Sequence, residues 1–530
     1  MKDNYKALGS RHAQHSFAQV PNMNTPRSQF NRSFNVKDTM DFDELTPVFI
    51  DEILPGDTCN LNTQVFARLA TQTVPVMDNM YIDFFFFFVP NRLTWSNWQK
   101  FCGEQEDPGD STDYLIPTIT GPGSGGFTVG DIYDKFGLPT GVNSLEINAL
   151  PLRAYNLIYN EWFRDQNLQD SVTVNKGDGP DPNTDYALLK RGKRHDYFTS
   201  CLPWPQKGDA VSLPLGTSAP IESNGQPLTV EDSTNGQDRI LGAASGAIDV
   251  TMSSSFTNPG RNDLYYVDGL QADLSTATAA TINELRNAFM VQELLELDAR
   301  GGTRYTEILK AHFNVTSPDQ RLQRPEFLAG GQISIIQHPI PQTSESNTTL
   351  QANLAAYSTG STSNNSIGFT KSFVEHGYVI GLAAARADIT YQQGVNKLWS
   401  RSDRYDFFWP KLQELGEQAV LNKEIYAQGT SADDDVFGYQ ERFAEYRYKP
   451  SEIRGQFRST FAQTLDVWHL GEQFSSLPAL NSTFIESTTP IERSLATATS
   501  YPHLLMDMFF NYKQARPMMV HGVPASLGRF

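Results

Sequence analysis

The chain has 530 residues, with 42 Lys and Arg against 60 Asp and Glu, and its formal net charge is −18. A chain this acidic is repelled as a whole by nucleic acid and by anionic membrane surfaces, which excludes a uniformly basic nucleic-acid coat. Aromatic residues make up 12% of the sequence, and 30 Pro and 38 Gly interrupt it often. This mixture favours β-sheets joined by long loops over a helical bundle.

The cysteines and the apolar segments indicate in which cellular compartment the chain folds and whether it enters a membrane. Cys59, Cys102 and Cys201 form no C-x-x-C pair and are too few for a disulfide framework, which favours a reducing compartment. The first residues lack the apolar core of a secretory signal. The most apolar stretch, YIDFFFFFVP at 81–90, contains Asp83 and has only about half the ~20 residues that a membrane helix needs. We therefore expect a soluble protein without membrane insertion.

The beginning of the chain is basic, although the whole is acidic. Residues 1–33 are polar, lack a periodic apolar pattern and have a net charge of +4, because Asp3 opposes five cations: Lys2, Lys6, Arg11, Arg27 and Arg32. Such a segment is typical of a flexible arm that orders on a partner, and a solvated tail is the alternative.

Strands are expected from 42 to 90. Pro55-Gly56-Asp57 predicts a turn within this region. Residues 81–89 are apolar on both faces of a strand, which suits a strand between two layers. Five consecutive phenylalanines at an exposed edge would promote aggregation, so we expect both faces to be covered.

Three helices are expected, at 151–165, 281–300 and 411–427. The first has Pro151 in its first turn and an apolar stripe that ends at Trp162. The second begins at a capping box of Thr281 and Glu284, carries the stripe Ile282, Leu285 and Phe289, and ends at Gly301-Gly302. We interpret these stripes as packing faces.

The stretch 209–280 differs from its flanks, because Gly, Ser, Thr, Ala and Pro dominate it and its net charge is −7. It predicts an exposed insertion with small strands of its own, and a disordered linker is the alternative. Beyond 303 we expect β pieces: a loop at 344–366, a long apolar strand within 372–392, and a strand in the C-terminal FFNYKQARPMMVHGV.

Motifs for catalysis or cofactor binding are weak. GPGSGG at 121–126 matches G-x-G-x-x-G, but Pro122 lies inside it and Gly137 and Pro139 interrupt the helix that should follow, so it predicts a flexible loop. His12 and His15 have no third metal ligand nearby, and the calcium-like run beginning at Asp433 has Ala444 at its twelfth position. We expect no enzyme, no cofactor and no metal site.

The densest basic patch is KRGKRH at 190–195, which contains Lys190, Arg191, Lys193 and Arg194. Such a patch binds phosphate without base specificity, or it pairs with acidic loops of a neighbouring subunit. The aromatic and Pro-rich segment that follows it favours the subunit contact.

Long segments of the chain carry a family resemblance. They include YFTSCLPWPQKGDAVSLPLG at 197–216, ARGGTRYTEILKAHFNVTSPDQRLQRPEFLAGG at 299–331, GLAAARADITYQQG at 381–394, LWSRSDRYDFFWPKLQELGEQAVLNKEIYAQG at 398–429, VFGYQERFAEYRYKPSEIRGQFR at 436–458 and ARPMMVHGVP near the end. These segments resemble the major capsid protein of the Microviridae, in the gokushovirus branch. The resemblance is weakest between about 217 and 280.

The resemblance implies a mainly β fold, an eight-stranded antiparallel viral jelly roll with long loop insertions that carry helices. About 60 copies would form a T=1 icosahedral virion around circular single-stranded DNA, assembled in the bacterial host cytoplasm. A small basic DNA-packaging protein would be a further partner. The domains would be a basic arm at 1–35, facing the interior, and a discontinuous jelly roll at 36–530. The inserted surface protrusion at 209–280 would meet two other copies at the threefold axis and touch a receptor on the bacterial surface.

The same interpretation assigns roles to individual residues. Lys2, Lys6, Arg11, Arg27 and Arg32 would face the DNA, and Tyr265 and Tyr266 would lie in the threefold protrusion. Tyr405, Phe407, Phe408 and Trp409 would form a subunit contact, because aromatic and Arg residues are enriched at interfaces. The alternative from another class is a host-surface or glycan-binding β protein that forms no shell. A hydrolase would need titratable residues of perturbed pKa clustered in one pocket.

Overall fold

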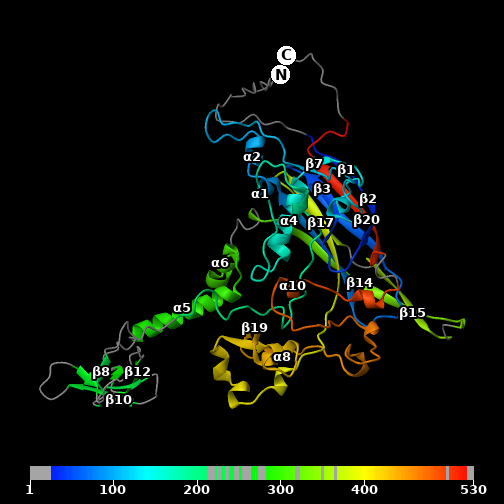
Figure 1. Ribbon diagram of the computed structural model, residues 1–530. Coiled ribbons are helices and arrows are strands. Elements are labelled where there is room, and N and C mark those ends of the chain that lie inside the picture. Colours follow the sequence, from blue (N-terminus) through cyan, green and yellow to red (C-terminus); the bar gives the residue numbers. More distant parts are fainter. Residues whose placement is uncertain are drawn as a thin grey trace, which may run out of the picture. The chain divides into compact units, whose positions relative to one another are not determined.

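The computed structural model describes most of the chain, in two compact units (Figure 1). One unit consists of Met1–Pro203 and Val315–Phe530, and the other of Trp204–Asn314. The described residues are 26–211, 221–223, 226, 228–232, 238–243, 250–252, 264–268, 270–272, 282–316, 323–347, 351–362, 367–496 and 501–521.

The first unit is built on one antiparallel sheet of ten strands, in which eight follow the order β1-β20-β4-β15-β14-β5-β17-β3, while β16 pairs with β4 and β2 pairs with β20. The strands are β1 (Ser28–Asn31), β2 (Phe34–Met40), β3 (Thr46–Ile53), β4 (Thr58–Leu69), β5 (Met80–Pro90), β14 (Glu326–Pro341), β15 (Leu354–Ser361), β16 (Ile367–Ser372), β17 (Gly377–Ala387) and β20 (Leu504–Arg516). Neighbouring strands are far apart in sequence, as a jelly roll requires.

The sheet curls until its two ends face each other. The long strand β14 turns the corner, because Glu326–Ile335 pair with β5 and Ile335–Pro341 pair with β15. Phe49 of β3 then contacts Phe510 and Tyr512 of β20, with ring centroids 5.2 and 5.4 Å apart. The main hydrophobic core lies between the facing halves. The predicted jelly-roll β-sandwich is therefore confirmed.

Strand β5 confirms the prediction of a strand covered on both sides. Phe84, Phe86 and Phe88 point into the main core, whereas Phe87 and Val89 belong to a second cluster on the opposite face of the sheet. Neighbouring β17 is buried along its whole length. At Gly381 a Cβ atom would lie 2.7 Å from the ring of Phe86, so this close approach requires glycine.

The second cluster is formed by the insertion between β5 and residue 190 (Figure 1). Its elements are α1 (Asn91–Thr94), α2 (Trp98–Phe101), β6 (Thr118–Thr120), α3 (Ile132–Lys135), β7 (Glu146–Asn148), α4 (Leu150–Ile158), a π-helical turn at Tyr159–Phe163 and a 3-10 turn at Asn183–Asp185. The predicted helix at 151–165 corresponds to α4 and the π-helical turn, and the GPGSGG segment is a loop as predicted.

The region after β17 forms a third cluster and corrects one prediction. It contains β18 (Glu417–Leu421), α8 (Asn422–Ile425), β19 (Val436–Glu441), α9 (Ala444–Arg447) and α10 (Ser482–Ile485), with 3-10 turns at Lys397–Trp399, Arg404–Asp406, Pro410–Glu414, Ser431–Asp434, Gly455–Phe457, Asp466–Trp468 and Ile491–Ser494. The helix predicted at 411–427 was wrong, because Gly416 adopts a φ of +81° and the next five residues pair with β19.

Three further predictions can be compared with the strands of the first unit. Pro55-Gly56-Asp57 forms the expected turn between β3 and β4, where the Asp57 carboxylate accepts a hydrogen bond from the Leu54 amide at 2.9 Å. The C-terminal strand is present as β20. The loop predicted at 344–366 was wrong in part, because β15 lies within it and pairs with β14 and β4.

The described part of the second unit combines small strands with two helices. β9 (Thr229–Asp232), β10 (Asp238–Ala243), β11 (Val250–Met252) and β12 (Leu264–Asp268) form a sheet in the order β11-β10-β9-β12, and β8 (Ile221–Ser223) pairs with β13 (Leu270–Ala272). Helix α5 (Ile282–Arg300) confirms the expected helix and α6 (Tyr305–Phe313) follows it, while the cap residue Thr281 lies outside the described residues. The predicted stripe Ile282, Leu285 and Phe289 is exposed rather than packed within the described part of the unit.

Candidate functional site

The only charged residue in the phenylalanine run, Asp83, organises a basic site on the outer face of the sheet. Because side chains alternate along β5, Asp83 shares this face with Phe85 and Phe87. A buried carboxylate requires cationic partners. Arg386 of β17 provides one, with its Nε 2.6 Å from Asp83 Oδ2, and Arg191 donates to the same oxygen while lying 4.9 Å from the Phe85 ring centroid.

The basic segment 190–195 is divided between internal pairing and exposure. Lys193 is buried, pairs with Glu472 at 2.8 Å and lies 4.4 Å from the Phe484 ring centroid. Burial raises the pKa of Glu472 even though Lys193 opposes the shift. Arg194 is exposed and pairs with Asp388 at 2.9 Å, and Lys190 is also exposed. Arg191 and Lys193, two of the four predicted cations, thus pair with acidic residues inside this chain's own fold.

The predicted aromatic contact segment lies on the surface. Tyr405, Phe407, Phe408 and Trp409 are between 42% and 63% exposed. The 3-10 turn Arg404–Asp406 holds them in place, because the Asp406 carboxylate accepts hydrogen bonds from the backbone amides of Ser402 and Asp403. These hydrogen bonds also lower the pKa of Asp406.

Arginine side chains pack on aromatic rings within this segment and next to it. The Arg404 guanidinium lies 4.6 Å from the Trp409 ring centroid, and Arg401 lies 4.1 Å from the ring of Tyr446. Phe408 packs edge-on against Phe443, with ring centroids 5.2 Å apart. The segment therefore presents a pre-ordered apolar surface rather than a loose loop, which reduces the entropy lost on contact.

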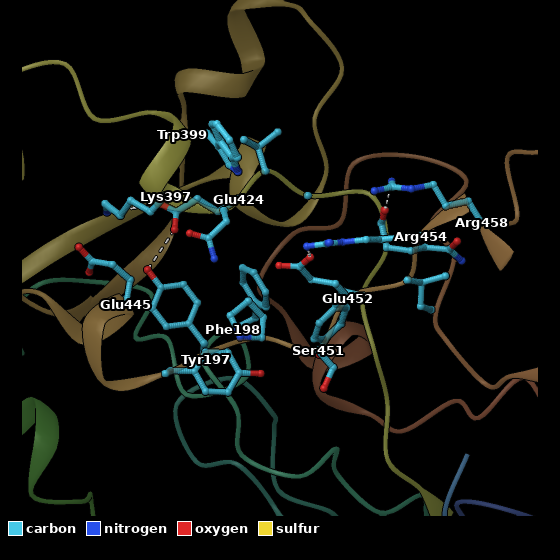
Figure 2. Close-up of a pocket in the computed structure, with 18 residues that line it drawn as sticks. Tyr197, Phe198, Lys397, Trp399, Glu424, Glu445, Ser451, Glu452, Arg454 and Arg458 are labelled. Atoms are coloured by element: carbon cyan, nitrogen blue, oxygen red, sulfur yellow. Dashed lines mark hydrogen bonds and ion pairs between the residues drawn. The ribbon is translucent and has the colours of Figure 1, made fainter. Parts of the chain in front are cut away.

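A pocket of about 360 Å³ has Lys397 and Trp399 in its lining (Figure 2). Tyr197 donates to Glu424 Oε2 at 3.0 Å, and Lys397 reaches the other carboxylate oxygen at 3.4 Å. Burial and the Glu424 charge raise the pKa of Tyr197. Trp399 is exposed at the pocket. Both Glu424 oxygens are thus engaged within the fold, one by Tyr197 and the other by Lys397.

The arm residues are described only in part. Lys2, Lys6 and Arg11 lie outside the described residues. Arg27 donates to the Gly56 carbonyl oxygen at 2.6 Å and to Thr58 Oγ1 at 2.7 Å. Arg32 pairs with Asp51 at 2.6 Å and lies over the Tyr512 ring. Both described arginines therefore attach the end of the arm to the sheet.

In the second unit, Tyr265 and Tyr266 lie in β12, opposite Glu231 and Val230 of β9. The boundaries of this unit, Trp204–Asn314, enclose the acidic stretch 209–280. Helix α5 carries exposed apolar side chains along most of its length, including Phe289 and Leu294. A surface of this kind marks an interaction site.

The described part of the chain offers no cluster of metal ligands. No group of three or more His, Cys, Asp or Glu in it could hold a metal ion. All three cysteines are free. Asp433 lies on an exposed turn, where its carboxylate accepts from the amides of Gln428 and Gly429. Among the described residues, no helix combines the length and the apolar character needed to span a membrane.

Comparisons with known proteins agree over nearly the whole chain. The family model described as capsid protein (F protein) matches residues 18–526. The chain is 62% identical to capsid protein VP1 of Bdellovibrio phage phiMH2K, over 99% of this chain and 100% of that protein. It is 41% identical to capsid protein VP1 of Chlamydia phage 1 (96% and 97%) and 36% identical to capsid protein VP1 of Spiroplasma virus 4 (99% of each).

Proposed function

This chain belongs to the capsid protein (F protein) family as a major capsid protein of a Microviridae phage, and we propose that about 60 copies form a T=1 icosahedral shell around a circular single-stranded DNA genome. The observation that carries the proposal is the match of a jelly-roll chain, over almost its full length, to three capsid proteins. As a capsid protein the chain is a component of the virion, and its assembly in the bacterial cytoplasm is part of the proposal.

The aromatic segment Tyr405–Trp409 is proposed as a subunit contact. Its four aromatic side chains are exposed on a backbone that is already ordered, and Arg442 adds a hydrogen bond to the Tyr405 carbonyl oxygen at 3.0 Å. Aromatic side chains on a rigid support are typical of the residues that dominate interface energies. Burying them against a second copy would remove this apolar surface from water.

The basic arm at 1–35 is proposed to face the genome, in contact with phosphates. Arg27 and Arg32 fix its end to the sheet, so the preceding cations, Lys2, Lys6 and Arg11, would extend from a defined point. Few cations per copy give weak, salt-sensitive and sequence-independent contacts. For this reason a separate small basic packaging protein is included among the partners.

The acidic insertion at 209–280 is proposed as the surface protrusion at the threefold axis, including Tyr265 and Tyr266, and as the part that touches the host receptor. Its support is its sequence, its separation into a second compact unit, and the exposed apolar side chains of α5 in that unit. The rest of 36–530, on either side of this insertion, would form the shell.

Electron microscopy of the purified chain tests the assembly. Closed particles of uniform size are expected, and monomers or small rings under all conditions would refute the shell and favour a surface-binding β protein. Phe407→Ser should reduce particle yield at least tenfold without changing the fold. Leu465→Ser, which alters another exposed apolar residue outside the aromatic segment, is the matched control.

Two variants test the other parts of the proposal. Deletion of 217–280 should abolish attachment to host cells and leave shell closure intact, and failure to close would make the insertion a structural element. Neutralising Lys2, Lys6, Arg11, Arg27 and Arg32 should lower DNA retention and flatten its salt dependence. An unchanged salt dependence would mean that the DNA contacts lie elsewhere.

A further inference from the structure

A second cleft, of about 610 Å³, lies in the first unit over the outer face of β5, next to the Asp83 network. Its walls come from β5, the π-helical turn after α4, the basic segment 190–195, the start of β14 and the end of β17. Its volume is within the range of about 300–1,000 Å³ that is usual for ligand sites. It is separate from the pocket of Figure 2 and shares no residues with the aromatic segment.

The cleft has an excess of positive charge. Among the described residues that line it, five are Lys or Arg and one, Asp165, is acidic. A smaller cavity of about 160 Å³ shares four of these cations with the cleft: Arg191, Lys193, Arg194 and Arg386. This smaller cavity is also lined by three carboxylates that do not line the cleft: Asp43, Asp196 and Asp388. The neutralising charges are therefore concentrated on one side of the cationic cluster, and the larger cleft borders its other side.

The pairing geometry supports this charge imbalance. A single carboxylate, Asp83, serves two guanidinium groups, those of Arg191 and Arg386. Burial lowers the pKa of Arg386, and the nearby charges of Arg191 and Arg194 add to this effect against the attraction of Asp83. Arg164 donates to the Gln169 carbonyl oxygen at 2.8 Å, and its buried Nε has no acceptor within the described chain. An anion in the cleft would relieve this crowding of cations.

Part of the cleft wall is aromatic. Trp162 and Phe327 are 38% and 43% exposed, with ring centroids 5.9 Å apart, and both rings pack on buried Phe87. The Arg324 guanidinium lies 3.9 Å from the Trp162 ring centroid, and the indole nitrogen donates to the Pro325 carbonyl oxygen at 2.9 Å. Arg324 therefore covers part of Trp162, and the exposed remainder of the two rings provides an apolar surface on which a flat ring can stack.

From this combination we propose that the cleft binds one nucleotide of single-stranded DNA, with a phosphate at Arg164 and Arg194 and the base stacked on Trp162 and Phe327. Cations beside exposed aromatic rings are the usual composition of such sites, because the phosphate supplies the charge and every base has a stackable face. An acidic peptide would satisfy the arginines but would leave the aromatic wall without a matching group, so the nucleotide is favoured. The inference rests on the proposed function, which supplies the DNA.

The test measures binding of a fluorescently labelled oligothymidylate to the unassembled full-length chain by anisotropy, over a series of salt concentrations. The double variant Arg164→Gln/Arg194→Gln should bind about tenfold more weakly, and the slope of log affinity against log salt should fall by about 0.7, for one lost phosphate contact. Trp162→Leu should weaken binding roughly tenfold and leave the slope unchanged, because stacking carries no charge.

Matched controls remove the same residue types elsewhere. Arg447→Gln/Arg454→Gln removes two exposed arginines outside the cleft, and Trp399→Leu removes an exposed tryptophan at the other pocket. Both should bind oligothymidylate as the natural chain does. Circular dichroism should show the same fold for all variants.

The outcomes separate the inference from the proposed function. Cleft variants that bind like the natural chain, in a protein whose particles still retain DNA, would overturn the nucleotide site and leave the shell proposal standing. Polyglutamate serves as a competitor alongside unlabelled oligothymidylate. Equally effective displacement of the labelled oligonucleotide by the two competitors would also overturn the nucleotide site, in favour of an acidic protein segment. A protein that forms no particles but shows the expected cleft effects would refute the shell and support the site.

Discussion

Replacing Asp181 by Asn should strongly destabilise the layer that covers β5. Arg153 of α4 is completely buried and is bound to Asp181 in a bidentate pair, with Nε and Nη2 donating at 2.7 and 2.6 Å. Arg153 Nη1 also donates to the carbonyl oxygens of Thr94 and Gly177. The Asp181 carboxylate is fully engaged, because it accepts from Tyr186 as well.

The magnitude follows from the burial of both charges. An Asn amide would turn donor hydrogens toward an arginine that can only donate, and the guanidinium would be left buried without a counter-charge. Removing one partner of a buried pair costs about 3–5 kcal/mol. The exposed pair Lys411–Glu414, at 3.3 Å, is the control, and Glu414→Gln should cause no measurable change in the free energy of unfolding.

The assay is urea unfolding of the unassembled chain, combined with hydrogen exchange of the amides of α4. The pH dependence gives an independent check. Burial would raise the pKa of Asp181, but the hydrogen bonds from Arg153 and Tyr186 outweigh it and hold the pKa below its ordinary value. A depressed pKa in the folded state stabilises above the unfolded value of about 3.9, and this stabilisation is lost as the pH falls through the folded pKa.

The difference between the natural chain and Asp181→Asn should therefore be full at pH 7 and shrink progressively below about pH 4. A variant within about 1 kcal/mol of the natural chain at pH 7 would refute the reasoning, since a buried arginine would then tolerate the loss of its counter-charge. A difference that stays constant down to about pH 2 would refute the assigned role of the carboxylate charge.

Three other predictions concern the core, the cysteines and the basic segment. Phe86→Ala should lower the free energy of unfolding by about 3–5 kcal/mol, because the ring is fully buried between the sheet halves, and a loss below about 1 kcal/mol in urea titration would show that the core collapses around it. Iodoacetamide at pH 8 should alkylate exposed Cys102 and spare buried Cys59, whose thiol pKa is raised by burial to about 11; mass spectrometry showing the reverse order would contradict the fold. The variant Lys193→Met should lose stability as the pH rises from about 4.5 to about 8. Burial already raises the pKa of Glu472, and without the ammonium group this pKa rises further, so ionisation of Glu472 destabilises the folded state. Thermal melts of the variant that show no such pH trend would contradict the pairing.

Local patterns in the sequence were sufficient for several elements. The turn at Pro55-Gly56-Asp57, the double-sided strand β5, the start of α4 and helix α5 follow from residues within a few positions of one another. Local patterns failed where a tertiary partner decided the outcome. The segment 411–427 was predicted as one helix, yet Glu417–Leu421 in its middle pair with β19 as a strand.

The sequence by itself determined the family and the strand-rich class, because these depend on composition, on periodicity and on long matching segments. Tertiary structure alone decided which charged side chains pair with one another. Arg191 reaches Asp83 across 108 positions of sequence and Lys193 reaches Glu472 across 279, so no local pattern reveals either pair. The register between β5 and β17 brings Arg386 to the same carboxylate. A run of cations in the sequence is therefore one cluster in space, with its neutralising carboxylates concentrated on one side, since sheet register and loop closure fix which charges meet.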